Sequence, residues 1–389
     1  MSKFHNASYG EIKKGLTTDI YFKRTKDILK KKNIRKKVTA EYTYHSQNWE
    51  WVVFTGLEEL LNLFEDIPVD IYALPEGTIF TSFSKNQVPI PVVVIKGYYD
   101  DFGIYETPSL GFICQASGIA TKTARIRLKA KDKNMISFGV RRMHPSITPM
   151  IDRSAYIGGC NGVSSILGAK KIGKNPQGTM PHALLLTLGD KGGWKAYDEV
   201  MDPEVPRTTL IDTFDDEKFA ALNSAEVMEN IDAVRIDTPS SRKGDFIDLI
   251  REVRWELDIR GYENIKIFVS GGINEESMEK LVEEPIDGFG IGTSISSAST
   301  VDFAMDIVSV DGKPLAKRGK YSGEKQVYRK NNSLEYFVYP IEKNIEGNLQ
   351  PMLKKYMEKG KIIKKTPDLD KMRQYVLKQL ESIKDNSKR

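Results

Sequence analysis

The spacing of hydrophobic and polar residues changes near residue 135 of this chain. Before that point, short β-type runs are separated by turn residues, and helical patterns cover residues 8–32 and 105–130. We expect strands in the intervening stretch at 38–44, 49–55, 69–74, 78–80 and 91–98. The first part of the chain therefore predicts an N-terminal α+β domain.

Beyond residue 135, short strands of the buried type alternate with amphipathic helices. We expect strands at 208–213, 233–238, 265–272 and 288–293. Helical patterns lie at 216–230, 244–260 and 275–284. Strand and helix in this order are typical of parallel βα units with right-handed crossovers. Residues 135–297 have room for about six or seven such units, so the sequence predicts an irregular or incomplete α/β barrel.

The end of the chain returns to strands and turns. Strand-like patterns at 307–310 and 335–340 precede a helical period over 369–383. We expect the terminal helix to dock on the body of the protein. The expected division is an N-terminal α+β domain at 1–118, an α/β barrel catalytic domain at 119–298, and a C-terminal region at 299–389 whose first part returns to the N-terminal domain.

Composition narrows the class of protein. The chain has 389 residues, of which 40% are hydrophobic and 29% charged, a normal balance for a globular protein of two or three domains. No apolar run reaches the roughly 18–20 residues that span a bilayer, and residues 1–6 lack the apolar segment of a signal peptide. We expect a cytoplasmic protein without a membrane partner.

Charge and cysteine content exclude further classes. The net charge of +5 is mild, and the basic run at 23–37 contains no aromatic residue for base stacking, so we interpret it as a solvated helix face rather than a nucleic-acid arm. Cys114 and Cys160 are the only cysteines, which excludes a cysteine zinc site and makes a disulfide framework implausible. Any catalytic step that needs an imidazole must use one of the four histidines.

Two consecutive barrel strands end in glycine-rich sequence. Ser270-Gly271-Gly272 follows one strand, and Gly290-Ile-Gly292-Thr293-Ser294 covers the end of the next. Glycines allow backbone N–H groups to approach an anion closely, and phosphate sites in barrels often form from the loops after the last two strands. The sequence predicts a ribose 5-phosphate site at the open end of the barrel, and the alternative is two tight turns without a ligand.

Polar residues follow two earlier strands. Asp212 ends one strand, and Arg235 and Asp237 lie on the same face of the next because alternate residues share a face. A carboxylate can accept hydrogen bonds from ribose hydroxyls, and the planar guanidinium suits phosphate. The alternative is an internal ion pair.

Two further clusters carry candidate chemistry. Phe138, followed by Gly139, offers a ring for stacking on a planar heterocycle, and Arg141 or Arg142 could meet an anion. Gly178-Thr179-Met-Pro-His182 opens a helix, so that the imidazole is a candidate nucleophile or proton carrier. Taken alone, the phenylalanine is more often core and the histidine more often structural.

These clusters, in this order, resemble the nicotinate phosphoribosyltransferase family, and its archaeal-type members most closely. The resemblance covers nearly the whole chain. It is carried by Gly15–Tyr21, Tyr105–Cys114, Phe138–Pro145, Gly178–His182, Ile211–Thr213, Arg235–Gly244 and Val269–Gly272.

The resemblance implies an activity. The family joins nicotinate to 5-phosphoribosyl 1-diphosphate, which gives nicotinate mononucleotide and diphosphate, with ATP hydrolysis coupled through a phosphohistidine. It also implies a homodimer with active sites shared between subunits, in which Tyr21 and Asp19 serve the neighbouring site. Because the leaving diphosphate gains negative charge, we expect Mg²⁺ and arginines to stabilise it.

Residue roles follow from the matched motifs. His182 resembles the phosphorylated histidine, Arg235 and Asp237 complete the catalytic set, and Asp237 would hold the ribose hydroxyls. The remaining residues expected to bind substrate are Asp19, Tyr21, Phe138, Arg141, Thr179, Asp212, Ser270, Gly271, Gly272, Gly292 and Thr293. Of these, residues 270–272, 292 and 293 would take the 5-phosphate.

The chain also departs from the family, and other functions compete. Residues 328–350 hold no cysteine where some relatives carry a zinc-knuckle-like segment, so we expect no metal there, and Asn161 stands where relatives often place Asp. A quinolinate phosphoribosyltransferase would need extra cations for a second carboxylate. A phosphosugar aldolase or isomerase would require a lysine or a pair of general bases at the strand ends. The third alternative is a non-catalytic nucleotide sensor.

Overall fold

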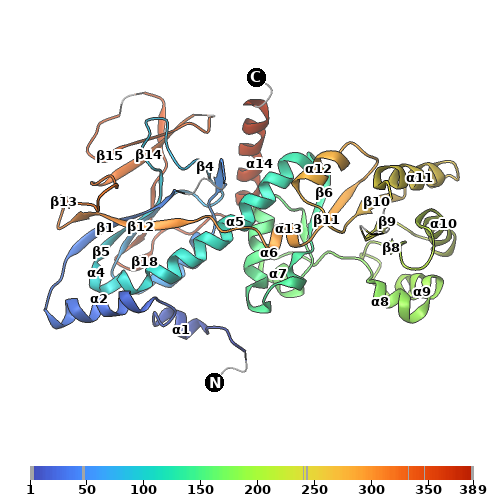
Figure 1. The fold of residues 1–389 in the computed structure, drawn as a ribbon, viewed down its shortest axis with the longest axis horizontal. Coiled ribbons are helices and arrows are strands. Elements are labelled where there is room, and N and C mark those ends of the chain that lie inside the picture. Colours follow the sequence, from blue (N-terminus) through green and yellow to red (C-terminus); the bar gives the residue numbers. More distant parts are fainter. Residues whose placement is uncertain are drawn as a thin grey trace. The chain divides into compact units, whose positions relative to one another are not determined.

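The protein divides into two compact units. The computed structural model describes residues 4–45, 49–239, 241, 244–331, 333–345 and 347–386. One unit joins residues 1–124 to 299–389, and the other is the intervening segment 125–298 (Figure 1). The expected domain boundaries lay at 118/119 and 298/299. The second unit is thus inserted into the sequence of the first.

The first unit is built on a seven-stranded antiparallel sheet. Strand β12, which follows the insertion, pairs with β1, so that Asp306 lies opposite Glu41. The strands in spatial order are β13 (Lys313–Pro314), β12 (Phe303–Val310), β1 (Lys37–Tyr44), β5 (Pro91–Tyr98), β3 (Asp70–Ala73), β17 (Lys354–Glu358) and β18 (Lys361–Ile362).

One face of this sheet carries the hydrophobic core of the unit. Val38, Ala40 and Tyr42 alternate along β1 and are buried there. Helix α3 (Leu57–Phe64) contributes to the same core, because its apolar residues recur at helical spacing. The sequence analysis did not predict this helix within the run of short strands.

The expected helix over residues 8–32 is two helices in the structure. Helix α1 (Tyr9–Lys13) and helix α2 (Ile20–Lys31) are separated by Gly15, whose φ of +69° is a left-handed conformation that ends a helix. Asp19 occupies the N-cap position of α2.

The remaining elements of the first unit are shorter strands and helices. The strands expected at 49–55 and 78–80 are reduced to a two-stranded ribbon, while β14, β16, β17 and β18 were not predicted. The elements are β2 (Val52–Val53), β4 (Ile79–Phe80), α4 (Tyr99–Phe102), η1 (Gly103–Tyr105), β14 (Lys325–Lys330), β15 (Tyr336–Pro340), β16 (Leu349–Pro351) and α14 (Leu369–Asn386). The long helix α5 (Glu106–Ala130) supplies residues to both units.

The second unit contains a six-stranded sheet in which every pair of neighbours is parallel. The strands in spatial order are β7 (Gly162–Val163), β6 (Asn134–Ser137), β11 (Gly288–Ile291), β10 (Lys266–Val269), β9 (Ala233–Ile236) and β8 (Thr208–Leu210). Among the described residues, β7 and β8 do not pair with each other, so the sheet stays open. The predicted incomplete α/β barrel is confirmed.

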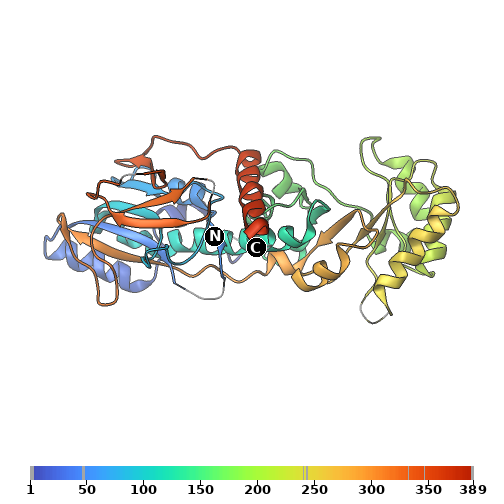
Figure 2. The same ribbon diagram turned by 90° about the horizontal axis from the view of Figure 1, so that it is seen from above.

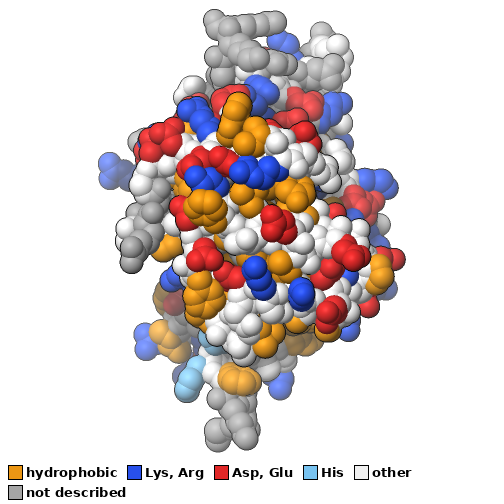
Figure 3. Space-filling model, turned by 90° about the vertical axis from the view of Figure 1, so that its right-hand side faces the viewer, with side chains coloured by type: hydrophobic (Ala, Val, Ile, Leu, Met, Phe, Trp, Pro, Cys, Tyr) orange, Lys and Arg blue, Asp and Glu red, His pale blue; other side chains and the backbone are white. Residues whose placement is uncertain are grey.

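Helices flank this sheet (Figures 1 and 2). They are α6 (Thr148–Ile157), α7 (Ile166–Lys171), α8 (His182–Leu188), α9 (Asp190–Val200), α10 (Glu217–Val227), α11 (Phe246–Asp258), α12 (Glu275–Leu281) and α13 (Thr293–Ser296). Figure 3 looks onto the outer side of α10 and α11, where hydrophobic side chains are interspersed with charged ones. Lys218 of α10 pairs there with Glu252 of α11 at 2.7 Å. No described helix is long and apolar enough to span a bilayer.

Candidate active site

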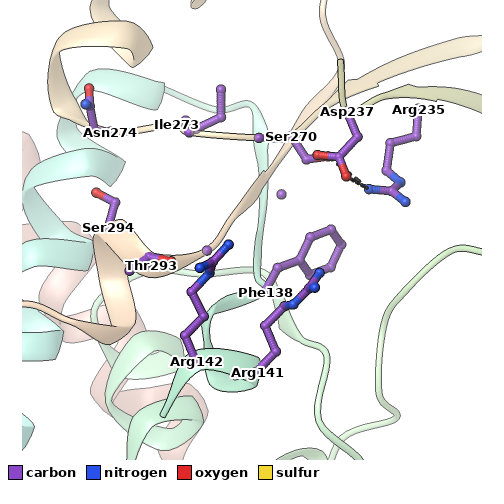
Figure 4. A pocket seen from close by; sticks show the side chains of 14 residues that line it. Phe138, Arg141, Arg142, Arg235, Asp237, Ser270, Ile273, Asn274, Thr293 and Ser294 are labelled. Carbon is purple, nitrogen blue, oxygen red and sulfur yellow. Dashed lines mark hydrogen bonds and ion pairs between the residues drawn. The ribbon is translucent and has the colours of Figure 1, made fainter. Parts of the chain in front are cut away.

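The carboxyl ends of the parallel strands surround a pocket of about 350 Å³. Because parallel strands end at one edge of their sheet, residues far apart in sequence meet there. The pocket is lined by Phe138, Arg141, Arg142, Arg235, Asp237, Ser270, Gly271, Gly272, Ile273, Asn274, Gly290, Gly292, Thr293 and Ser294 (Figure 4). Nine of the residues expected to form the site are among them.

The turn after β10 has the conformation that its two glycines permit. Gly271 and Gly272 have φ values of +84° and +77°, which side chains rarely adopt. A Cβ atom on Gly272 would meet no atom within 4 Å, so the backbone there faces open space. Gly292 has a negative φ and precedes only the four-residue helix α13, so this second turn offers chiefly backbone amides.

The ring of Phe138 lies directly against Gly290. A Cβ atom at position 290 would come within 2.4 Å of two ring carbons. Gly139 is equally confined, since its Cβ would lie 2.6 Å from the side chain of Ser296. The absence of a side chain at Gly290 therefore leaves room for the phenyl ring beside the pocket.

Two arginines lie on the short helix η2 (Gly139–Arg142), which follows Phe138. Both guanidinium side chains are exposed and extend toward the pocket (Figure 4). The family resemblance gave a substrate role only to Arg141, although the Arg-Arg pair was a sequence signal for both residues. Gly290, Asn274 and Ser294 also line the pocket without an assigned role; the glycine was visible in sequence, but its contact with the ring was not.

Arg235, Asp237 and Ser270 form one hydrogen-bonded group. Arg235 Nη1 lies 3.2 Å from Asp237 Oδ2 and donates to Ser270 Oγ at 3.0 Å. Ser270 Oγ donates to Asp237 Oδ1 at 2.8 Å. Arg235 Nη2 donates to the carbonyl of Met180 at 3.0 Å. The sequence analysis gave an internal ion pair as the alternative to ligand binding by Arg235 and Asp237. That ion pair is present, and both residues line the pocket.

His182 is the first residue of α8 and lies beside this group. Its Nε2 atom is 3.9 Å from Asp237 Oδ2 and 3.7 Å from Asp212 Oδ2. Its Nδ1 atom lies 3.2 Å from the hydroxyl of Thr213. The imidazole is 38% exposed, so one side of the ring remains open to a ligand. A histidine whose ring nitrogens both lie near polar side chains is a candidate to accept a transferred group.

Asp212 is the most enclosed carboxylate of the site. Its side chain is 1% exposed, and neither of its oxygens has a hydrogen-bond partner among the residues that the structure describes. Burial raises the pKa of Asp212, the neighbouring Asp237 raises it further, and His182 and Arg235 oppose the shift. Such a group depends on a nearby cation for its charge.

Other expected residues lie apart from the pocket lining. Thr179 donates to the carbonyl of Met180 at 3.3 Å, the same carbonyl that receives Arg235. Asp19 and Tyr21 belong to the first unit, where Asp19 accepts from the hydroxyl of Thr107 at 2.9 Å and Tyr21 is exposed. Within the expected Arg235–Gly244 motif, residues 240, 242 and 243 lie outside the described residues.

Asn161 does not face the pocket. It precedes β7, at the opposite edge of the sheet from the carboxyl ends. Its Oδ1 atom accepts from Arg127 Nη2 at 2.6 Å and from the backbone N–H of Met135 at 3.0 Å. The side chain of Asn161 therefore joins the amino-terminal ends of β6 and β7 and does not contact the pocket.

Comparison with protein families matches three segments of the chain. The N-terminal domain of quinolinate phosphoribosyl transferase matches residues 19–117, and its C-terminal domain matches residues 119–306. The C-terminal domain of nicotinate phosphoribosyltransferase matches residues 340–389.

Comparison with individual proteins shows to which of these families the chain belongs. A nicotinate phosphoribosyltransferase of Mycobacterium tuberculosis is 30% identical over 339 residues, which cover 81% of this chain and 69% of that protein. The chain belongs to the nicotinate phosphoribosyltransferase family. A second relative of the same name, from Bacillus subtilis, is 27% identical over 58% of this chain and 46% of its own length.

Solved structures agree with this family fold. A crystal structure described as nicotinate-nucleotide pyrophosphorylase from Pyrococcus furiosus is 52% identical to this family member, covers 99% of both chains and superposes with a TM-score of 0.94. Human nicotinic acid phosphoribosyltransferase superposes with a TM-score of 0.77 over 94% of both chains, and at 18% identity it shows the shared fold.

Proposed function

We propose that this chain is a nicotinate phosphoribosyltransferase of the archaeal type. Nicotinate would react with 5-phosphoribosyl 1-diphosphate: the bond from C1 of the ribose to diphosphate breaks, and the pyridine nitrogen bonds to the same carbon. The products are nicotinate mononucleotide and diphosphate. The 52% identity with the Pyrococcus furiosus protein supports the archaeal subgroup.

One observation carries the proposal: a stacking ring, a carboxylate–guanidinium group and a double-glycine turn line the same pocket, and a histidine lies beside them. The amides of Gly271, Gly272 and Gly292, with Thr293, would bind the 5-phosphate. Asp237 would accept from the ribose hydroxyls.

Arg141, which the resemblance places among the substrate-binding residues, and the adjacent Arg142 would contact the diphosphate. Their exposed guanidinium groups can each donate two parallel hydrogen bonds to phosphate oxygens. Their charge would stabilise the diphosphate as it leaves and gains negative charge.

The pyridine would lie on Phe138, which Gly290 leaves uncovered. Tyr21 of a neighbouring subunit would cover its other face, with Asp19 close by, so the proposal includes a homodimer with shared sites. The exposure of Tyr21, at 56%, supports this part. Stacking would hold the ring nitrogen in line with the anomeric carbon.

ATP is proposed as a co-substrate that phosphorylates His182. The γ-phosphoryl group would pass to a ring nitrogen and ADP would leave, and later hydrolysis of phosphohistidine would return the free histidine. The short distances from His182 to Asp212 and Asp237 support this assignment, because the two carboxylates would stabilise a cationic imidazole. Thr213 would orient the ring through Nδ1.

Mg²⁺ is proposed as the metal cofactor. The described residues contain no cluster of three or more potential ligands for a metal ion. Mg²⁺ in phosphate enzymes is commonly held by one or two carboxylates plus substrate phosphates. Asp237, which lines the pocket, and Asp212, with its unpartnered oxygens, fit that donor set. The bound ion would neutralise charge on the leaving diphosphate. A cytoplasmic location is also part of the proposal.

A nicotinate-nucleotide pyrophosphorylase acting on quinolinate is the second candidate. The two quinolinate family domains and the description of the Pyrococcus furiosus structure favour it. Quinolinate has a second carboxylate and needs another cation. Arg235, however, is already engaged with Asp237 and Ser270, which leaves Arg141 and Arg142 as the pocket arginines for diphosphate and substrate together.

Diphosphate release separates these functions. The assay supplies 5-phosphoribosyl 1-diphosphate with nicotinate, nicotinamide or quinolinate, each with and without ATP. We expect release with nicotinate and stimulation by ATP. Release with quinolinate alone, accompanied by CO₂, would replace the proposal with the second candidate. A His182→Ala variant that retained ATP stimulation at the normal rate would remove the phosphohistidine from the mechanism.

A further inference from the structure

We propose that Ser270 is a positioning residue, whose hydroxyl bridges Arg235 and Asp237 and so fixes the carboxylate that would accept from the ribose hydroxyls. This inference rests on the proposed function, because it assigns a role within the same sugar site. It also changes the role expected for Ser270, which was grouped with the residues that bind the 5-phosphate.

The single proton of the Ser270 hydroxyl is used within the protein. The residue is 3% exposed. Its Oγ atom accepts from Arg235 Nη1 at 3.0 Å and donates to Asp237 Oδ1 at 2.8 Å. A serine hydroxyl has a single proton. While Ser270 donates that proton in its hydrogen bond to Asp237, it has no second proton to donate to a phosphate oxygen.

The closest direct contact between Arg235 and Asp237 joins one nitrogen to one oxygen. Nη1 lies 3.2 Å from Oδ2, whereas arginine–carboxylate pairs are frequently bidentate, with two parallel hydrogen bonds. A bidentate pair would engage both oxygens of Asp237 with the guanidinium. In the structure, the hydroxyl of Ser270 bridges Nη1 and Oδ1, because it accepts from the first and donates to the second.

The neighbouring backbone leaves little room for another arrangement. A Cβ atom on Gly271 would lie 3.0 Å from Asp237 Oδ1. Arg235 Nη2 is held by the carbonyl of Met180, two residues before His182. The guanidinium is therefore anchored at one end to the segment that carries the histidine, and at the other end to Ser270.

The first test measures binding without turnover. Ribose 5-phosphate and inorganic phosphate are titrated into wild type and Ser270→Ala. Ser270→Ala removes a hydroxyl that is hydrogen-bonded to two charged side chains, Arg235 and Asp237. We expect this loss to weaken ribose 5-phosphate binding by about 10- to 100-fold. Inorganic phosphate, which has no hydroxyl pair, should bind both proteins within about twofold. An equal loss for both ligands would show that the hydroxyl contacts phosphate, and would overturn the proposal.

Ser270→Thr is the matched control because it retains the hydroxyl. We expect it to restore ribose 5-phosphate binding to within about fivefold of wild type, provided that its melting temperature is unchanged. Gly290 lies close to Ser270, since a Cβ there would be 3.2 Å from Ser270 Cβ, so melting curves are needed to detect crowding by the added methyl group.

A double-mutant cycle tests the role without depending on that control. In an Asp237→Asn background, Ser270→Ala should cost less than about threefold in ribose 5-phosphate binding, because its partner has already changed. The full loss in that background would mean that Ser270 acts independently of Asp237, and would overturn the proposal. Folding of each variant is checked by its melting curve.

The two proposals can fail separately. A wild-type protein that binds ribose 5-phosphate but releases no diphosphate with nicotinate would contradict the proposed function. The double-mutant cycle of Ser270 and Asp237 would still test the positioning role, because it measures binding alone. Normal turnover by wild type, together with unaltered ribose 5-phosphate binding by Ser270→Ala, would sink the positioning role alone.

Discussion

At the scale of single residues, Gly290 determines whether the Phe138 ring can lie in the pocket. Gly290→Ala would place a methyl group within 2.4 Å of the ring, so the ring must shift. We expect the KM for nicotinate to rise at least about tenfold, and the free energy of unfolding to fall by about 1–3 kcal/mol from crowding. Steady-state kinetics and denaturant unfolding measure both.

Gly272→Ala is the matched control for this prediction. A Cβ atom there meets no neighbour within 4 Å, but the φ of +77° is strained for alanine. The change alters the proposed phosphate turn and leaves the ring in place, so it should raise the KM for 5-phosphoribosyl 1-diphosphate instead. The stacking interpretation is wrong if both variants affect the two substrates equally.

Asp212 is the second residue whose environment makes a prediction. Its side chain is buried, has no hydrogen-bond partner within the described part of the chain, and lies 3.7 Å from His182. Asp212→Asn keeps the shape but removes the charge that would stabilise a cationic imidazole. We expect ATP stimulation of diphosphate release, taken as the ratio of the rates with and without ATP, to fall at least about tenfold. Retained stimulation in a normally folded variant would argue against an electrostatic role.

At the scale of elements, local sequence predicted some helices and strands better than others. Strand β5 begins and ends at the expected residues 91 and 98 because its apolar run is bounded by turn residues and Pro91 opens it. The expected helix at 8–32 is broken by Gly15, and α3 was missed because a short apolar helix resembles a buried strand.

The first turn of α5 predicts a pH dependence of stability. Burial, followed by the nearby Asp306 carboxylate, raises the pKa of Glu106 from 4.5 to about 7. Between these values the folded protein keeps a proton that the unfolded chain has lost. Stability from this group therefore falls as the pH rises through that window and stays low above it.

Glu106→Gln should remove this dependence. We expect the variant to have a higher melting temperature than wild type at pH 8, where wild type must ionise a buried carboxyl group, and a similar one at pH 5. The exposed Glu226→Gln is the control and should shift neither. Stabilisation at pH 5 alone would contradict the assigned direction.

At the scale of the whole molecule, the sequence predicted which strand ends carry the site but not how their side chains share hydrogen bonds. The carboxyl ends of parallel strands meet by topology, so Phe138, Asp237 and Gly272 could be grouped from sequence. That Ser270 donates to Asp237 depends on rotamers and on the separation between two strands. No local pattern contains that information, and a serine at a strand end fits either role.

The proposed dimer predicts complementation between two inactive variants. Tyr21→Ala would remove the ring lent to the neighbouring site, and His182→Ala would remove the proposed phosphorylated residue from its own site. After unfolding and refolding together in equal amounts, half of the dimers are mixed, and each mixed dimer has one site with both residues intact. We expect about one quarter of wild-type ATP-coupled activity, from purely statistical assembly. If Tyr21 acts within its own chain, mixing restores nothing, because every site then lacks one of the two residues.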